Sequence, residues 1–145
     1  MFNSCRLQGA SALTACAMSH TLITSLDLSP HPEGGWYRET MRQPSPDGSR
    51  GLATAILFLL EDGQRSHWHR VDATELWLWH AGAPLTLLIE QTEHQLTGTA
   101  PQVIVPANAW QSAEAREGWA LVSCVVTPAF DFAGFELAPP GWSPE

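Results

Sequence analysis

Lysine is absent from this sequence: all seven basic residues are arginines, whereas 15 residues are acidic, and the formal net charge is −8. Without a lysine amine, the protein cannot form a Schiff base with a carbonyl substrate. The arginines are scattered along the chain, and binding to phosphate backbones needs clustered cations. We therefore expect no nucleic-acid partner, and a neutral or metal-assisted small ligand fits the composition better.

Cysteine is scarce as well. The three cysteines lie far apart, at positions 5, 16 and 124, and form no C-x-x-C pair. An odd number of distant cysteines argues against a disulfide framework and favours a reducing compartment, so we expect a cytoplasmic protein. Long apolar runs are also missing, because no stretch approaches the roughly 20 residues that a membrane-spanning helix needs. We therefore expect no membrane partner.

The first 19 residues lack acidic side chains and are rich in small residues, with Arg6 as their one arginine. The stretch LTAC, which ends at Cys16, matches a lipoprotein processing box, but the apolar segment before it is too short and weak to favour export. We expect residues 1–19 to be a disordered tail and residues 20–145 to form a single domain.

After residue 20, helical periodicity is nearly absent. Short extended runs alternate with clusters of Gly, Pro, Asn and Asp, which is typical of an all-β sandwich or barrel. The predicted strands cover residues 34–41, 52–61, 66–71, 74–81, 85–91, 94–98, 102–106 and 119–127. Eight strands at this spacing are enough for a jelly roll or a small barrel.

Two histidines and a glutamate form a notable cluster in the stretch SHWHRVDATELWLWHAG, residues 66–82. Side chains alternate along a strand, so His67 and His69 are expected to share one face. A tight turn after Val71 would bring Glu75 beside them on the next strand. These three groups could hold a divalent metal (Mn, Fe, Ni or Zn) with open positions for water and substrate. The alternative is a hydrogen-bonded group that lines a pocket, where a histidine beside a glutamate accepts a proton near neutral pH.

Four blocks in order along the chain carry a family resemblance. They are DLSPHPEGGWYRET (27–40), ILFLLEDG (56–63), SHWHRVDATELWLWHAG (66–82) and VIVPANAWQSA (103–113). Together they resemble the cupins, and within them the DUF985 or cupin-5 family of unassigned function. The resemblance implies a double-stranded β-helix, the jelly roll of RmlC-like cupin barrels, which is usually a homodimer with the ligand pocket inside the barrel.

The same resemblance suggests a metal set. A typical metal cupin holds its ion with two histidines and a glutamate from the first motif and one histidine from the second. The matching positions here are His67, His69 and Glu75 for the first motif and Gln111 for the second. A neutral amide is a poor ligand, so three donors remain for a catalytic metal.

Other pocket residues come from the neighbouring blocks. Alternation predicts that Tyr37 and Glu39 share one face, and the resemblance favours Glu33 and Tyr37 as pocket residues. Trp77 shares the face of Glu75, and we expect it to contact a ligand. The amide of Gln111 could exchange hydrogen bonds with a hydroxyl-rich ligand.

The leading hypothesis is a small-molecule-binding cupin that acts on a sugar or nucleotide-sugar derivative as an isomerase or epimerase. By analogy with metal-free epimerases of this fold, His69 would be the base and Tyr37 the acid, with Glu75 beside the base. Glu33, Trp77, Gln111 and His67 would bind the ligand. Two alternatives stay open: a metal-dependent dioxygenase or isomerase that uses His67, His69 and Glu75 as ligands, and a non-catalytic ligand-binding protein.

Overall fold

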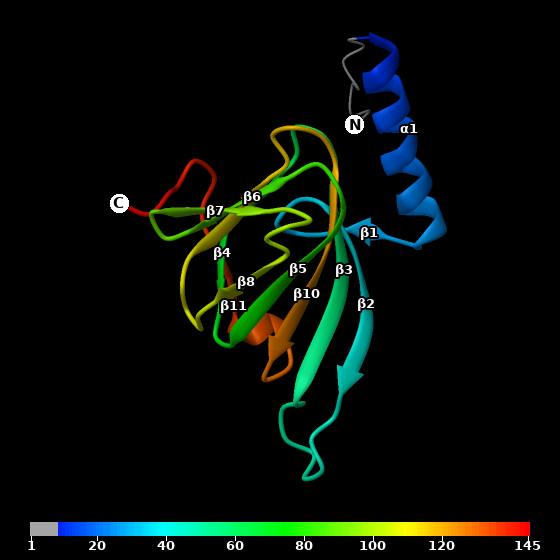
Figure 1. The fold of residues 1–145 in the computed structure, drawn as a ribbon. Helices are drawn as coiled ribbons and strands as arrows, with labels where there is room; N and C mark the ends of the chain where they lie inside the picture. Colours follow the sequence, from blue (N-terminus) through cyan, green and yellow to red (C-terminus); the bar gives the residue numbers. More distant parts are fainter. Residues whose placement is uncertain (1–8) are drawn as a thin grey trace.

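The computed structural model describes residues 9–145, and in this part of the chain eleven strands form two antiparallel sheets (Figure 1). The six-stranded sheet has the order β1-β2-β3-β10-β5-β8, and the five-stranded sheet has the order β11-β4-β9-β6-β7. The strands are β1 (Ser29–Pro30), β2 (Trp36–Gln43), β3 (Ala53–Leu60), β4 (Arg65–Val71), β5 (Thr74–Gly82), β6 (Leu85–Ile89), β7 (Thr92–Leu96), β8 (Gln102–Val105), β9 (Gln111–Glu114), β10 (Ala120–Thr127) and β11 (Phe135–Leu137). The architecture confirms the all-β prediction.

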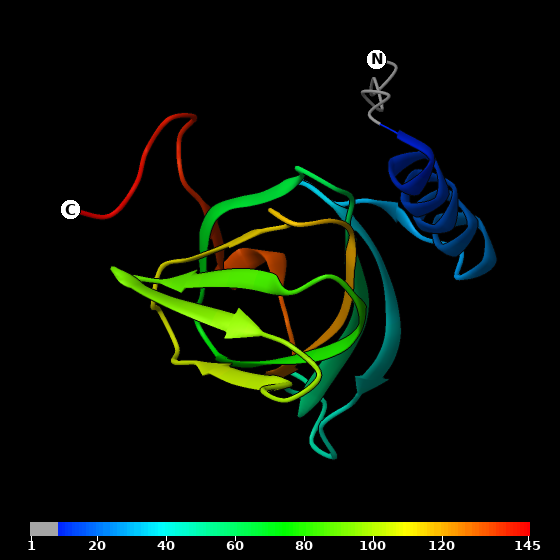
Figure 2. The ribbon, with the colours of Figure 1, turned by 45° about the horizontal axis from the view of Figure 1, so that its top comes forward.

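The two sheets wrap around one interior, which Figure 2 shows along the barrel. Strand β10 is typical of how the sequence fills it: Ala120, Val122, Cys124 and Val126 are buried, and the residues between them are more exposed. This alternation is the period of two that a strand with one buried face requires. Side chains from both sheets complete the main core, namely Phe58, Leu60, Trp77, Leu85, Leu87, Leu96, Val105, Ala113, Ala115 and Ala120.

Strand β9 was not among the predicted strands. Its sequence, QSAE, contains no β-branched or aromatic residue, so its own preference for an extended conformation is weak. It is extended because it pairs with β4 on one side and β6 on the other. Tertiary pairing therefore makes a strand where local sequence gives little signal.

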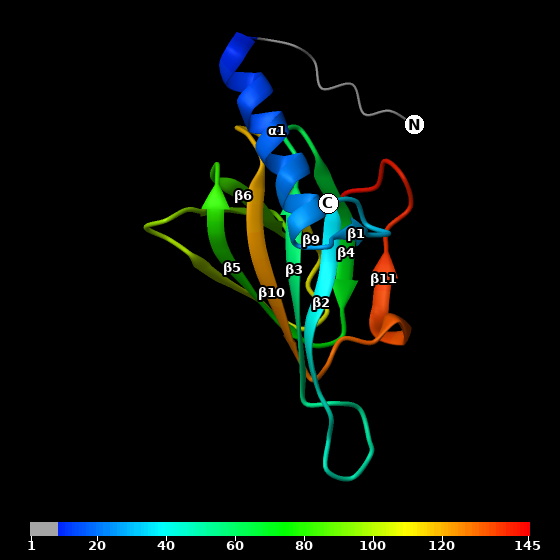
Figure 3. The same cartoon turned by 90° about the vertical axis from the view of Figure 1, so that its right-hand side faces the viewer.

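A helix precedes the barrel. Helix α1 (Gly9–Ser25) extends away from the sheets next to β1 (Figures 1 and 3). Residues 9–19 were predicted to be a disordered tail, and this prediction is wrong for them; the remainder of that tail, residues 1–8, lies outside the described residues. The helix contains no proline and no glycine after Gly9, and its alanines and leucines favour helix formation.

Two further expectations concern this region. Cys16 is disulfide-bonded, contrary to the expectation of reduced cysteines, whereas Cys124 is free and buried. Among the residues from 9 onward, no helix combines the length and the apolar character needed to cross a membrane.

Candidate functional site

A cavity of about 340 Å³ lies between the six-stranded sheet and strand β4. Strands β2, β3, β5 and β10 contribute its walls on one side, β4 contributes on the other, and residues 130–135 close part of it. Its lining residues are Asp27, Ser29, His31, Glu33, Tyr37, Arg38, Glu39, Arg42, Thr54, Ile56, His69, Val71, Glu75, Cys124, Val126, Phe130, Phe132 and Phe135. Two histidines and two buried glutamates therefore share a hollow with an apolar, phenylalanine-rich wall.

Glu33 reaches this cavity through a tight turn. The turn closes with hydrogen bonds from His31 N–H to Gly35 O (2.9 Å) and from Gly34 N–H to His31 O (3.0 Å). Gly34 and Gly35 have φ values of 104° and 84°, which side chains with a Cβ rarely adopt. A Cβ on Gly34 would collide with the backbone oxygen of Arg65. The glycine pair therefore allows the turn to lie against strand β4 with Glu33 inside.

The Glu33 carboxyl is held from several sides. Its Oε1 atom accepts a hydrogen bond from the hydroxyl of Ser66 (3.1 Å), and its Oε2 atom lies 3.2 Å from Nε2 of His69 and 3.7 Å from Nδ1 of His31. Burial raises the pKa of Glu33 from 4.5 to about 8, and the Ser66 hydrogen bond opposes this only in part. Glu33 is therefore protonated at neutral pH.

The tautomer of His69 follows from its contacts. Its Nδ1 atom lies 2.8 Å from the backbone oxygen of His67, which can only accept, so Nδ1 carries the hydrogen. Nε2 then presents its lone pair to Glu33 at 3.2 Å. Burial lowers the pKa of His69, although the nearby Glu75 opposes this shift. A neutral imidazole facing a protonated carboxyl means that the pair holds one proton between them.

His31 is the residue of this site that the sequence analysis missed. It packs edge-on against Tyr37, with ring centroids 4.5 Å apart, and its Nδ1 atom accepts the backbone N–H of Glu33 at 3.2 Å. Burial lowers the pKa of His31 to about 4, with His69 adding to the shift, so the imidazole is neutral. The available signal was its position two residues before Glu33 in the first family block.

Glu75 forms a second buried group. Its Oε2 atom accepts a hydrogen bond from Nε2 of Gln111 (2.6 Å), and Oε1 of Gln111 accepts the indole N–H of Trp77 (2.9 Å). Cys124, which is free and buried, also lines the cavity. Burial raises the pKa of Glu75 and raises the pKa of the Cys124 thiol well above its usual value. Glu75 is therefore anchored through Gln111 to the core.

The prediction that His67 and His69 share a face is wrong. Pairing of β4 with β9 shifts register between Ser66 and His69, so three residue steps on β4 match two on β9. This bulge turns both Ser66 and His69 toward Glu33. His67 instead points away from the cavity, and its Nε2 atom lies 3.0 Å from the backbone oxygen of Pro139.

The predicted metal set consequently does not assemble. His69 and Glu75 line the cavity, but His67 does not, and the amide of Gln111 is already bonded to Glu75 and Trp77. Across residues 9–145, no group of three or more His, Cys, Asp or Glu side chains is arranged to hold a metal ion. The residues predicted as ligands thus do not fit a shared ion.

Of the other residues predicted to lie near a ligand, some line the cavity and some do not. Tyr37 and Glu39 do share the cavity face, opposite Phe58 and Ile56 of β3. Trp77 is only 1% exposed and belongs to the main core, and neither it nor Gln111 lines the cavity.

Comparison with known proteins agrees with this architecture. Residues 20–138 match the family described as Cupin superfamily (DUF985). A protein from Shewanella oneidensis, SO0799, is 37% identical, with a TM-score of 0.71 over 91% of this chain and 85% of that one. A hypothetical protein from Leishmania major is 30% identical, with a TM-score of 0.71 over 82% of this chain and 86% of that one.

More distant structures share the fold alone. KdgF from Halomonas sp. is 16% identical, with a TM-score of 0.61 over 74% of this chain and 90% of that one. No curated protein matches the chain. The two sheets are those of a jelly-roll cupin barrel, and with the family match over residues 20–138 they establish that the chain belongs to the DUF985 family of the cupin superfamily.

Proposed function

We propose that this protein binds a small polar molecule in its cavity and that the Glu33–His69 pair moves a proton to or from it, as an isomerase or epimerase would. The 3.2 Å contact between Nε2 of His69 and Oε2 of Glu33, inside a cavity of about 340 Å³, is the observation that carries this proposal. A protonated carboxyl beside a neutral imidazole can supply a general acid and a general base to the same ligand.

The chemistry follows from where that proton lies. Glu33 would give its proton to a carbonyl oxygen of the ligand while Nε2 of His69 takes the proton from the adjacent carbon, which leaves an enol. The Nδ1–H of His69 stays bonded to the backbone of His67, so the ring keeps its orientation as it gains charge. In the return step the Glu33 carboxylate takes a proton back from an oxygen of the enol or enediol while a proton is delivered to carbon. Delivery to the former carbonyl carbon would isomerise the ligand, and delivery to the opposite face of the original carbon would epimerise it. Tyr37 lines the same cavity and is the proposed donor to carbon, and the proton held by His69 then restores its hydroxyl.

A sugar or nucleotide-sugar derivative is the proposed ligand class. The lining supports it by combining hydrogen-bonding groups with phenylalanine side chains, and sugar rings present both polar edges and apolar faces. By the family resemblance we also propose a homodimer, which sedimentation velocity would test.

Binding and turnover are separate tests. A thermal-shift screen with sugars and nucleotide sugars should find a compound that stabilises the protein by about 2.7 kcal/mol at 100 times its dissociation constant. That compound should then incorporate deuterium from heavy water at a carbon-bound position in the presence of the protein. Binding without deuterium incorporation would favour the non-catalytic alternative over the enzyme.

A further inference from the structure

The cavity has a buried floor and an exposed rim. Glu33, His69 and Glu75 form the floor, with exposed fractions of 8%, 2% and 6%. The rim is the set of lining residues that are exposed to solvent: Asp27, Ser29, Arg38, Glu39, Arg42 and Phe132. A ligand that brings its reacting carbon to Glu33 and His69 therefore has its other end beside the rim.

Arg38 belongs to the rim because strand β2 is uncovered at that point. Strand β1 pairs only with Trp36 and Tyr37, and the described part of the chain places no other strand on that side of β2. From Arg38 onward β2 is therefore the edge of its sheet. Alternation directs Arg38 to the face opposite Tyr37, but a long side chain at a free edge is not confined to one face, and Arg38 lines the cavity.

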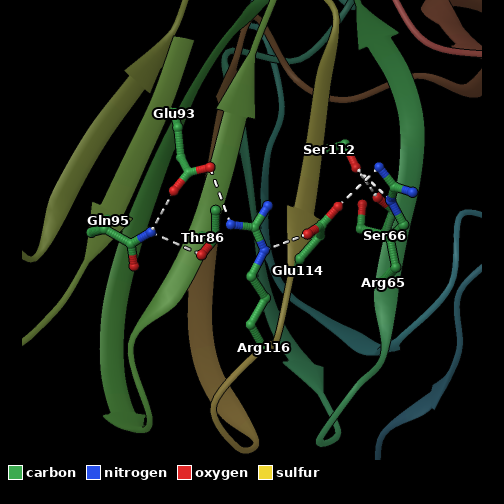
Figure 4. Close-up of polar contacts among 8 residues, drawn as sticks. All are labelled: Arg65, Ser66, Thr86, Glu93, Gln95, Ser112, Glu114 and Arg116. Atoms are coloured by element: carbon green, nitrogen blue, oxygen red, sulfur yellow. Dashed lines mark hydrogen bonds and ion pairs between the residues drawn. The ribbon is translucent and has the colours of Figure 1, made fainter. Parts of the chain in front are cut away.

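The other arginines are used in ion pairs. Six arginines lie in residues 9–145, and five of them hold a carboxylate. The pairs are Arg42–Glu39, Arg50–Asp72, Arg65–Glu114, Arg70–Glu136, and Arg116 with both Glu93 and Glu114. Figure 4 shows Arg65 and Arg116, which hold Glu114 between them. Arg38 alone among these six forms no ion pair and donates no side-chain hydrogen bond within the described residues.

The acidic residues of the rim do not neutralise Arg38. Glu39 is held by Arg42 through two hydrogen bonds, of 2.9 and 2.8 Å. Asp27 also lines the rim, but its carboxylate forms no ion pair with Arg38. Because the sequence contains no lysine, Arg38 is the cationic side chain of this cavity that is left for a ligand.

A guanidinium in this position suits an anionic group. Its planar set of N–H donors matches the paired oxygens of a carboxylate or a phosphate, and such charged hydrogen bonds are stronger than neutral ones. The hydroxyls of Ser29 and Tyr37, which lie opposite each other in β1 and β2, also line the cavity and have no hydrogen-bond partner within the described residues. They are available to the neighbouring oxygens of the same ligand.

The floor does not repel an anion as two carboxylates in water would. Burial raises the pKa of Glu33 to about 8, so this carboxyl is neutral at pH 7. Burial raises the pKa of Glu75 as well. Negative charge on a ligand is therefore favoured at the rim, beside Arg38, and the uncharged part of the ligand is left for the floor.

We propose that the ligand of this cavity carries an anionic group, a carboxylate or a phosphate, which binds Arg38 at the rim while its polar carbon skeleton reaches Glu33 and His69. This inference rests on the proposed function, because it names the substrate class of the same cavity. It narrows the sugar proposal to sugar acids and sugar phosphates, the phosphates of a nucleotide sugar included.

Four probes that share one sugar ring and differ in charge test the proposal: glucose, glucuronate, glucose 6-phosphate and glucosamine. Isothermal titration calorimetry at neutral pH should show at least one of the two anions binding about tenfold or more tightly than glucose, and glucosamine binding more weakly than that anion. The tighter of the two anions identifies the carboxylate or the phosphate as the recognised group. No binding of either anion, equal affinity for the anions and glucose, or a preference for glucosamine would overturn the inference.

Matched variants assign the preference to one side chain. Arg38→Gln removes the charge at an exposed position, so it should fold normally and bring the affinity for the anion to within about twofold of that for glucose. Arg38→Lys keeps the charge but not the planar donors, and should retain part of the preference. Arg116→Gln removes an exposed arginine outside the cavity and should leave every affinity unchanged. An anion preference that survives in Arg38→Gln would overturn the inference.

Deuterium incorporation separates this inference from the proposed function. If the wild-type protein binds an anion through Arg38 but exchanges no carbon-bound hydrogen of any bound sugar, the proton-transfer proposal fails and the role of Arg38 stands. If a neutral sugar binds and exchanges while neither anion is preferred, the proposed function stands and the inference about Arg38 fails.

Discussion

Nε2 of His69 and Oε2 of Glu33 lie 3.2 Å apart inside the barrel, and each group has its pKa shifted by burial toward its neutral form. His69 comes from strand β4, whereas Glu33 comes from the turn before β2. Their contact depends on a bulge in one segment and on a glycine pair in the other. Because the two residues share a proton, changing either one should alter the pH dependence of the unfolding free energy or the affinity for a ligand, and each can be measured separately.

The buried carboxyl of Glu33 should make the protein less stable as pH rises from 6.5 to 8. Its pKa is raised from 4.5 to about 8, so this contribution is complete below pH 4.5 and is lost as pH rises through about 8. His31 acts in the opposite sense, because its pKa is lowered from 6.5 to about 4 and its contribution is lost as pH falls through about 4. The two effects oppose each other between pH 4.5 and 6.5; above pH 6.5 Glu33 acts in the same direction as Glu75, whose pKa burial also raises.

Urea unfolding at pH 6.5, 7.2 and 8 measures this effect. The free energy of unfolding of the wild type should fall by roughly 1 kcal/mol per pH unit over this range. Glu33→Gln should remove the Glu33 share of that slope and make it clearly shallower, and Glu93→Gln, which changes an exposed carboxylate, should retain it. The same slope in Glu33→Gln as in the wild type would mean that Glu33 is ionised in the folded protein.

His67 and His69 should differ sharply in their effect on ligand binding. His69→Ala removes the imidazole that faces Glu33, and should weaken a cavity ligand by about tenfold or more. His67→Ala removes only a side-chain contact with Pro139 outside the cavity, so affinity should stay within about twofold. Calorimetry with the best compound of the sugar screen makes the comparison. A loss of affinity as large in His67→Ala as in His69→Ala would support the shared-face arrangement instead.

Trp77→Phe should destabilise the core by about 1–3 kcal/mol, because the amide oxygen of Gln111 would lose its buried donor. The change should also loosen Glu75, whose carboxyl is held by the same amide. Chemical denaturation gives the free energy, and Trp110→Phe is the control, since no described side chain or backbone group accepts a hydrogen bond from that indole nitrogen. Equal stability of the Trp77→Phe variant and the wild type would contradict the proposed anchoring role.

Gly34→Ala should cost more than about 2 kcal/mol and disturb the cavity. The added Cβ would meet the backbone oxygen of Arg65 at a φ of 104°, so either the turn or strand β4 must move. Gly48→Ala is a matched control, because Gly48 also has a positive φ, of 75°, but has nothing within 4 Å of its Cβ position. We expect Gly34→Ala to be clearly less stable in thermal melts. Comparable melting temperatures for the two variants would show that the turn tolerates the side chain.

Much of the fold could be predicted from local pattern. The strands that alternate apolar and polar residues, such as β10, and the turn residues between them identify an all-β chain. Tyr37 and Glu39, which alternation places on one face, both line the cavity, although Arg38 between them lines it too. Helix α1 and strand β9 escaped prediction for opposite reasons. The helix lies in a segment that resembled a tail, and β9 gains its conformation from its neighbours.

The site was less accessible, because its geometry depends on departures from regular structure. Strict alternation predicts His67 and His69 on one face, but because of the bulge in β4 His69 faces the cavity and His67 points away from it. The contact between Glu33 and His69 joins distant segments of the chain, and no spacing rule relates these two residues. Trp77 and Glu75 lie on the same strand and the same face, yet Trp77 belongs to the main core and Glu75 lines the cavity. Alternation predicts which face a side chain takes, but not how far along the barrel it lies from the cavity.

The central claim is that Glu33 and His69 share one proton, with the hydrogen of His69 on Nδ1. Nitrogen-15 NMR of labelled histidine, assigned by comparison with His69→Ala, reports directly which nitrogen is protonated as pH is varied. We predict a neutral His69 with hydrogen on Nδ1 at neutral pH, because burial lowers the pKa of this imidazole. An imidazolium at neutral pH, or a ring with its hydrogen on Nε2, would contradict the account.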